Sequence, residues 1–371
     1  MKRAFTIFSI LFTPFFVSLA QNRISIDTIQ INSAVKQMKD SLNIPGIAVG
    51  IAVDNEIKYT NTIGYANLET KTPLDVNSIW HICSISKQFS TVACLKLVEE
   101  KKLSLEDKVS KYIDNLPSKY SEVTIFNLLS QTSGIKDYIN DTNLYGLPWS
   151  EVKNKLLSDT LNFNPGNSWS YSNTGFWIAA QIIEKITGIN YNQYLQQYIL
   201  AKLQMPNTQR ISGEKIIESR VNGYVPTING FNNSTMDICR FFGQGDGDLM
   251  STINDLLIWN IALTQGKVLN NVLLSKLWTP SKLKNGNILE TAPDSGINYG
   301  LGWFIKSING DKVVWTPGSG FGFSTSLLYL PQYKLIIVVF CNREQFLMAD
   351  EVGLSIAKII MNNQNSKYLQ K

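Results

Sequence analysis

The sequence predicts an α/β fold of the α+β type, in which one antiparallel sheet flanked by helices is built from both ends of the chain and an all-helical lobe is inserted in the middle. Two observations predict it. Strand patterns occupy residues 44–67 and return over residues 300–340, whereas the region between them is mostly helical in pattern. We expect a sheet lobe of about residues 21–125 and 250–371 and a helical lobe of about residues 126–249, which together form one domain.

The composition is that of an ordinary globular protein, with 371 residues of which 44% are hydrophobic and 17% charged. The single histidine, His81, is the most restrictive residue, because a Ser-His-Asp or Cys-His site would have to use it and a His-rich zinc site is excluded. No two cysteines are spaced C-x-x-C, and Cys83 and Cys94 stand too far apart on a predicted helix to form a disulfide. If the protein is an enzyme, we expect its proton chemistry to use Lys, Tyr or a carboxylate.

The first twenty residues are expected to be a secretory signal peptide, so that the domain spans residues 21–371. Lys2 and Arg3 precede an apolar run that ends in Ser18-Leu19-Ala20, with small residues where a signal peptidase reads. We therefore expect a periplasmic or secreted protein, whereas an uncleaved segment would anchor the chain to a membrane. Removing two cations lowers a formal net charge of +5, which leaves too little positive charge to argue for nucleic acid as a partner.

The N-terminal strands are predicted to form a hairpin. Gly46–Val53 is an apolar run typical of a buried strand, Asp54-Asn55 forms the turn, and Ile57–Tyr65 returns. From Ser84 to Glu100, apolar side chains recur at helical spacing, so a helix is expected there.

The middle region has a looser pattern and is rich in Asn, Gly, Tyr and Pro. Helices are expected near residues 149–159, 174–187, 191–203 and 255–265. Near the C-terminus, Asn309-Gly310 is the strongest short hairpin signal, and a second turn is expected at Pro331-Gln332-Tyr333. The strands beside these turns and the closing amphipathic helix are predicted at residues 300–307, 312–316, 324–330, 335–340 and 348–361.

Ser84-Ile85-Ser86-Lys87 is the candidate nucleophile motif, because S-x-x-K on a helix places the lysine amine beside the serine hydroxyl. Burial lowers the pKa of a lysine, so a neutral Lys87 can take the Ser84 proton without a histidine. The motif also begins at six other serines, but Ser84 opens the most apolar helix of the first half of the chain. The alternative for Ser84 is a plain helix N-cap.

Tyr171 and Asn173 are the second candidate element, on a turn just before a predicted helix. A tyrosine near a lysine ammonium has a stabilised phenolate and can relay protons. Asn173 can hold either the lysine or a substrate amide. The alternative for Tyr171 is a turn residue packed on the helix.

A glycine-rich segment, Trp315–Ser324, is the third candidate element. Its glycines, Gly318 among them, allow a backbone or a ligand to approach closely. The backbone N–H of Ser319 can then face that of Ser84 and form an oxyanion hole. The alternative is a simple glycine-rich turn, and the segment lacks the G-K-[ST] and the following helix of a phosphate-binding loop.

Together these residues resemble the serine β-lactamase-like hydrolases, the group that contains class C β-lactamases, D-alanyl-D-alanine carboxypeptidases and related esterases. The resemblance runs from about Ile44 to the end of the chain. It includes the further segments Leu128–Gly134, Gly245–Asp255, Tyr299–Trp303 and Val338–Asn342. It implies a penicillin-binding-protein-like fold with the site between its two lobes, in which Ser84 is acylated, Lys87 is its base partner, Tyr171 is a second proton carrier and Asn173 orients the substrate.

Two positions depart from the family pattern. The first position of the third motif, usually Lys or His, is Thr316, which cannot carry the positive charge that attracts a substrate carboxylate. The histidine usual in the Thr-Ser-Gly segment is Gln131. Arg343 is a candidate for the missing cation, and neutral or hydrophobic acyl substrates are favoured. His81 is expected to be a packing or surface residue rather than a general base.

The leading hypothesis is an exported serine hydrolase that acts through an acyl-enzyme on a small-molecule or peptide-like ester or amide, with no metal and no cofactor. The second hypothesis narrows the chemistry to a β-lactamase or D-alanyl-D-alanine carboxypeptidase. The third is a cell-envelope binding protein that keeps the fold but has lost turnover. The sequence leaves the oligomeric state open.

Overall fold

The computed structural model describes residues 24–140, 147, 150–151, 154–155, 160–235 and 243–368. The predicted signal peptide lies outside these residues, as does most of the helix expected near residues 149–159. Within the described ranges, no helix combines the length and the apolar character needed to cross a bilayer.

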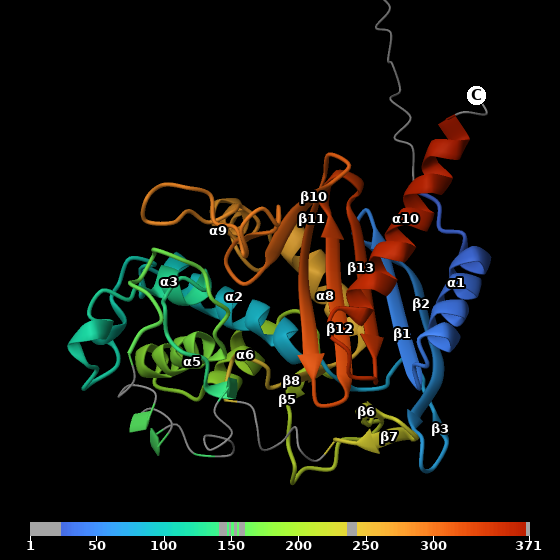
Figure 1. Ribbon diagram of the computed structural model, residues 1–371, viewed down its shortest axis with the longest axis horizontal. Coiled ribbons are helices and arrows are strands. Elements are labelled where there is room, and N and C mark those ends of the chain that lie inside the picture. The colour runs from blue at the N-terminus through green and yellow to red at the C-terminus, as the bar shows by residue number, and fades with distance from the viewer. Residues whose placement is uncertain are drawn as a thin grey trace, which may run out of the picture.

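One antiparallel sheet, built from both ends of the chain, forms the centre of the fold as predicted (Figure 1). Its order is β3-β2-β1-β13-β12-β11-β10-β9, so the first and last long strands, β1 and β13, are neighbours, with Val49 opposite Val339. The strands are β1 Gly46–Val53, β2 Glu56–Asn67, β3 Thr72–Pro73, β9 Asn298–Tyr299, β10 Phe304–Ile308, β11 Asp311–Gly320, β12 Phe323–Leu330 and β13 Leu335–Cys341.

Helices cover both faces of this sheet (Figure 1). On one face, α1 and α10 enclose a core with β1, β12 and β13, and on the other face α8 packs against β1 and β13. The helical part of the chain lies beside the sheet, and α2 runs from the sheet into it (Figure 1). The helices are α1 Thr28–Ser41, α2 Ser86–Glu99, α3 Ile125–Leu129, α5 Asn173–Thr187, α6 Tyr191–Leu195, α8 Ile253–Thr264, α9 Asn271–Leu277 and α10 Met348–Tyr368.

Short elements complete the chain. They are the 3-10 turns η1 Cys83–Ile85, η2 Val109–Lys111, η3 Ser118–Tyr120, η4 Tyr138–Asn140 and η7 Pro331–Tyr333, and the π-helical turn η6 Gln196–Leu200. Two small sheets are β4 Trp80–His81 with β8 Leu249–Ser251 and β5 Gln209–Arg210, and β6 Tyr224–Thr227 with β7 Gly230–Asn233.

The predicted hairpin turns are confirmed, and their backbone explains why the signals were strong. Asp54 and Asn55 both have positive φ, at 52° and 65°, as do Asn309 and Gly310, at 53° and 89°. Two-residue turns of this kind match the right-handed twist of the strands, and Asn, Asp and Gly tolerate them best.

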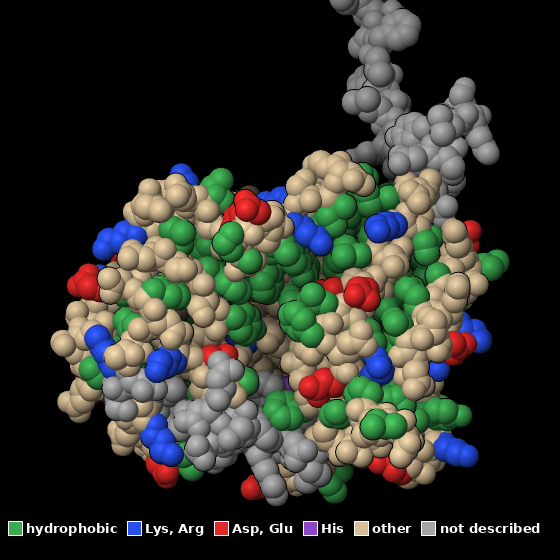
Figure 2. Space-filling model, viewed as in Figure 1, with side chains coloured by type: hydrophobic (Ala, Val, Ile, Leu, Met, Phe, Trp, Pro, Cys, Tyr) green, Lys and Arg blue, Asp and Glu red, His purple; other side chains and the backbone are tan. Residues whose placement is uncertain are grey.

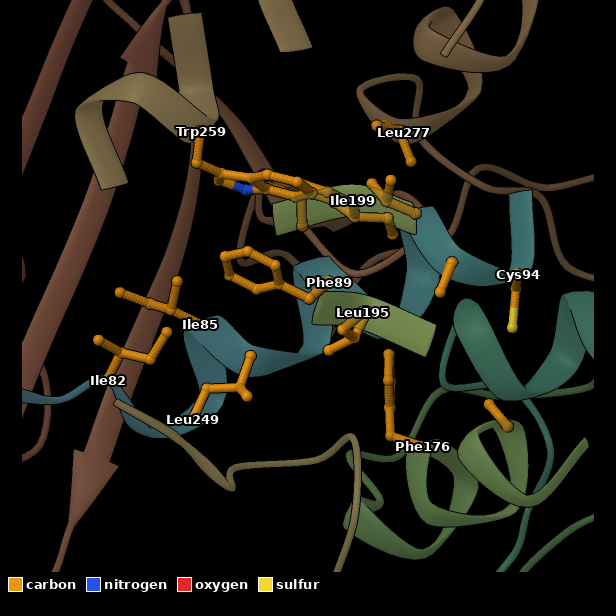
Figure 3. Close-up of a cluster of buried hydrophobic side chains, with 14 of the residues drawn as sticks. Ile82, Ile85, Phe89, Cys94, Phe176, Leu195, Ile199, Leu249, Trp259 and Leu277 are labelled. Atoms are coloured by element: carbon orange, nitrogen blue, oxygen red, sulfur yellow. The ribbon is translucent and has the colours of Figure 1, made fainter. Parts of the chain in front are cut away.

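The helix α2 is buried on nearly every side and forms the centre of the larger hydrophobic core (Figure 3). Phe89 stacks on Trp259 of α8 with ring centroids 4.1 Å apart, and Phe176 of α5 and Leu195 of α6 also line this core. Because α2 is packed by both the sheet side and the helical side, its first turn is held rigidly between them.

The helix α1 was not predicted from the sequence. It carries an Asp27 N-cap whose side chain accepts from the Gln30 backbone, but it buries only Ile31 and Val35. Two buried positions in fourteen residues give too weak an apolar period to identify a helix from its pattern.

Candidate active site

Ser84 lies in the 3-10 turn η1, directly before α2, and its side chain is partly exposed. The residue before it, Cys83, has a left-handed backbone with φ of 50°. A non-glycine residue in this region is uncommon and occurs where the surrounding structure holds it in place. The turn therefore presents the Ser84 hydroxyl at the surface of an otherwise buried segment.

Lys87 is 1% exposed, and its amine makes three hydrogen bonds. Nζ donates to Ser84 Oγ at 3.2 Å, to Asn173 Oδ1 at 2.6 Å and to the Asp246 carbonyl at 2.5 Å. The expected juxtaposition of Ser84 and Lys87 is therefore present. The three acceptors aim the amine at the serine hydroxyl.

Tyr171 and Asn173 meet the same amine from the start of α5. Lys87 Nζ lies 4.8 Å from the Tyr171 ring centroid, and an interaction with the Ser84 side chain lowers the pKa of Tyr171 against the larger effect of burial. Both polar atoms of the Asn173 side-chain amide form hydrogen bonds. Its Oδ1 accepts from Lys87, and its Nδ2 donates to Asp137 Oδ2 at 2.8 Å. Asn173 thus holds the lysine in this structure.

Two carboxyl groups that the sequence analysis did not single out complete the surroundings of Lys87. Asp246 is fully buried, and its Oδ2 accepts a hydrogen bond of 2.5 Å from the Tyr138 hydroxyl. Asp137 reaches the amine through Asn173. Asp246 lies in the Gly245–Asp255 segment of the resemblance, but only the fold places it beside Lys87, from which 159 positions separate it.

Burial and charge act in opposite directions on Lys87. Burial lowers the pKa of its amine, and the carboxylates of Asp246 and Asp137 raise it in part. Burial likewise raises the pKa of Asp246 and of Tyr171, although the nearby Ser84 side chain favours the Tyr171 phenolate. The net lowering for Lys87 favours the neutral amine that a general base requires.

The third element, β11, lies against the nucleophile turn. A Cβ placed on Gly318 would meet the Ile82 carbonyl oxygen at 2.7 Å and Cys83 Cβ at 2.9 Å, so only glycine allows the strand to approach this closely. Ser319 follows it, is partly exposed and pairs with Ser324 of β12. The strand therefore brings the backbone of Ser319 beside the turn that carries Ser84.

Thr316 lies further along the same strand and is 3% exposed. Its hydroxyl donates to the Gly302 carbonyl at 3.3 Å. Arg343 lies elsewhere, because its guanidinium contacts Gln345 and the Met348 sulfur at the start of α10. Among the described contacts, none joins Arg343 to Ser84 or Lys87.

His81 is fully buried rather than exposed, with Nε2 2.6 Å from the Gly247 carbonyl and Nδ1 3.3 Å from Cys83 Sγ. Burial lowers its pKa to about 4, so the ring is neutral at neutral pH. His81 thus packs behind the nucleophile turn, in agreement with the structural role expected for it.

Gln131 anchors the segment that leads into α5. Its Oε1 accepts from the Ser172 backbone N–H at 2.8 Å, and its carbonyl accepts from Ser170 at 3.0 Å. Gln131 is buried and therefore fixes the segment on which Tyr171 and Asn173 stand.

Aromatic side chains flank the site. The Trp169 ring lies 6.4 Å from Tyr171, 5.9 Å from Tyr299 and 6.2 Å from Phe304, measured between centroids. Figure 2 shows that hydrophobic side chains line both sides of a hollow between the helical part and the sheet. Within the described residues, no group of three or more His, Cys, Asp and Glu side chains is arranged to hold a metal ion.

Comparison with known proteins agrees with this geometry. The sequence model of the Beta-lactamase family matches residues 31–357. A penicillin-binding protein of Bacillus subtilis (strain 168) is 29% identical over 334 residues, which cover 84% of this chain and 71% of that protein. A D-aminopeptidase of Brucella anthropi is 26% identical over 348 residues, which cover 92% of this chain and only 64% of that protein.

Among solved structures, the octameric penicillin-binding protein homologue from Pyrococcus abyssi superimposes with a TM-score of 0.80 at 25% identity, covering 91% of this chain and 78% of that one. The D-amino acid amidase of Ochrobactrum anthropi SV3 in complex with D-phenylalanine gives a TM-score of 0.76 at 19% identity, with coverage of 90% and 99%. This second likeness concerns the fold alone.

Proposed function

Because the chain belongs to the beta-lactamase family of serine hydrolases, we propose that it hydrolyses an ester or a peptide-like amide through an acyl-enzyme on Ser84. One observation carries the proposal. The buried Lys87 amine donates to Ser84 Oγ while Asn173 and the Asp246 carbonyl hold it from behind. A nucleophile beside an oriented base is the arrangement that serine acylation requires.

In the first half of the proposed reaction, the Lys87 ammonium first loses one proton to solvent, so that its neutral amine accepts from the Ser84 hydroxyl instead of donating to it. Ser84 Oγ then attacks the substrate carbonyl carbon, and its proton passes to that amine. The backbone N–H groups of Ser84 and Ser319 hold the developing oxyanion. The proton then passes to the leaving group, with the Tyr171 hydroxyl as a carrier at the serine. The product of this half is a Ser84 ester and a free alcohol or amine.

In the second half, water attacks the Ser84 ester. The same amine and phenol remove the water proton and return a proton to Ser84 Oγ. The acid is released, and the enzyme regains its first state. A general base acts only when neutral, so the rate of acylation rises with pH through the pKa of Lys87, which burial lowers.

The substrate we propose has a neutral or hydrophobic acyl group. Thr316 presents no cation at the site, and the rings of Trp169, Tyr299 and Phe304 offer apolar surface beside Tyr171. The relatives named for penicillin binding and for D-aminopeptidase activity make β-lactams and D-amino-acid peptides the compounds to compare. We also propose that residues 1–20 direct export to the periplasm or the medium.

The test is labelling with a fluorophosphonate probe together with a panel of p-nitrophenyl esters, nitrocefin and D-amino-acid peptides. Ser84→Ala should lose both labelling and turnover. Ser281→Ala is the control, because Ser281 also begins an S-x-x-K sequence but is buried, with its hydroxyl donating to the Gly300 carbonyl. Equal labelling of the wild type and Ser84→Ala would overturn the proposal. Labelling of the wild type without product release would instead favour a binding protein.

A further inference from the structure

The loop of residues 245–249 wraps the first turns of α2, and its contacts extend beyond those needed to hold Lys87. The Asp246 carbonyl accepts from Lys87, the Gly247 carbonyl lies against His81, and the Leu249 N–H donates to Ser86 Oγ. The same loop buries the Asp246 side chain completely. The mechanism proposed above uses the carbonyl of Asp246 but gives its carboxyl no task.

A buried carboxyl group that the mechanism does not use needs an explanation, because burying an unpaired charge in a protein interior costs free energy of folding. Asp246 Oδ2 is held by the Tyr138 hydroxyl, and Oδ1 has no hydrogen-bond partner among the described residues. Tyr138 is itself fixed, since its oxygen accepts from the Gly243 N–H at 3.1 Å and its ring packs edge-on against Trp177. The carboxyl is thus oriented from one side and left open to electrostatic interaction on the other.

We propose that Asp246 is a positioning residue whose carboxylate stabilises the ammonium that forms on Lys87 when the amine takes the proton of Ser84. This inference rests on the function proposed above. In that step the Ser84 O–H bond breaks, an N–H bond forms on Lys87 and the serine oxygen bonds the substrate carbon. The amine changes from neutral to positive, so its attraction to the ionised form of Asp246 grows as the transition state is approached.

The neighbours of Asp246 support this assignment. Asp246 exerts the strongest attraction of any acid on the charged form of Lys87, ahead of Asp137. Asp248, two residues away, is equally buried, but it lies 3.4 Å from the Arg210 guanidinium and acts least on Lys87. The titratable groups that face Asp246 from the elements packed around it are Lys87, Tyr138, Tyr171, Tyr191, Asp137 and Asp248.

The test is the pH dependence of Ser84 acylation in Asp246→Asn, measured as the rate of fluorophosphonate labelling and as kcat/KM for p-nitrophenyl acetate. Asparagine keeps the volume and can still accept from Tyr138, but it removes the charge. We expect kcat to fall by about tenfold to a hundredfold with KM little changed. We also expect the acid limb of the profile to move down by about one pH unit, because Lys87 then loses its proton more easily.

Asp248→Asn is the matched control and should leave the acid limb in place. If Asp246→Asn does not fold, Tyr138→Phe removes the hydrogen bond that favours the Asp246 carboxylate, so a smaller fraction of Asp246 is ionised and a smaller shift in the same direction is expected. A uniform loss of activity with an unmoved acid limb would mean that Asp246 is only structural and would overturn the inference alone. Turnover that survives in Ser84→Ala would overturn both this inference and the proposed function.

Discussion

The sharpest perturbation that the structure offers is Gly318→Ala, which adds one carbon between β11 and the nucleophile turn. That carbon would meet the Ile82 carbonyl oxygen at 2.7 Å and Cys83 Cβ at 2.9 Å, and Thr325 Oγ1 would lie closer still. Thr325 already donates to the same Ile82 carbonyl at 3.0 Å, so the added carbon would also break that hydrogen bond. A backbone carbonyl cannot rotate away as a side chain can.

The size of the effect follows from these contacts. Restoring an ordinary separation of about 3.5 Å requires β11 and the turn to move apart by about 0.8 Å. The Ser319 N–H, next in the chain, would move with the strand and leave the oxyanion. Loss of one such donor costs about 3 kcal/mol, or a hundredfold to a thousandfold in kcat. Overpacking costs a further ~1–3 kcal/mol of stability.

The assay is steady-state hydrolysis of a p-nitrophenyl ester, with thermal unfolding measured on the same preparations. Gly353→Ala on α10 is a matched control, since its added carbon would meet Leu328 Cδ1 at 2.5 Å on the far face of the sheet. It should lower stability without lowering kcat. Full kcat in folded Gly318→Ala would refute the reasoning that β11 supplies an oxyanion donor.

Three further outcomes are expected. The pKa of His81 is lowered from 6.5 to about 4 in the folded chain, so the stability that it contributes is present above pH 6.5 and is lost as the pH falls towards 4. The destabilisation caused by His81→Gln should therefore shrink by about 3 kcal/mol between pH 7 and pH 4 in urea titrations, and a constant difference would contradict this. Gln131→Ala leaves the buried Ser172 N–H without its acceptor and should lower the free energy of unfolding by about 1–3 kcal/mol. We expect kcat to fall by a larger factor than the factor by which KM changes. Thr316→Lys should raise kcat/KM for a D-alanyl-D-alanine peptide, relative to a neutral ester, by about tenfold through one charge-assisted hydrogen bond; an unchanged ratio of the two would argue against a cation role at this position.

Local sequence signals predicted the sheet well. The turns at Asp54-Asn55 and Asn309-Gly310 need positive φ, which few residues tolerate, so their positions could be read from the chain. The apolar run before the first turn, Gly46–Val53, was predicted as a buried strand and is buried along its whole length. By contrast, α9 and the pairing of β4 with β8 depend on contacts between distant segments, and the pattern of their own residues did not identify them.

At the site, too, local features could be predicted from the sequence and contacts between distant segments could not. Ser84 and Lys87 are three residues apart, so helical geometry alone predicted that their side chains would meet. The boundaries of the two lobes and the chemical roles of the site residues stay predictions. Arg343 was considered as a substitute cation, but it lies in the bend after β13, and its guanidinium contacts Gln345 and the Met348 sulfur at the start of α10. The direction of a side chain in a bend depends on the tertiary contacts around it, which a local sequence pattern does not give.

What the sequence determined by itself was therefore everything that depends on neighbours along the chain: the hairpins, the nucleophile helix, the family resemblance and the loss of a cation at Thr316. What only the tertiary structure decided was the environment of the Lys87 amine. Its hydrogen-bond partners Asn173 and Asp246 lie 86 and 159 positions away. Charge and burial act through space, so the state of a buried amine is settled by the residues that the fold places around it.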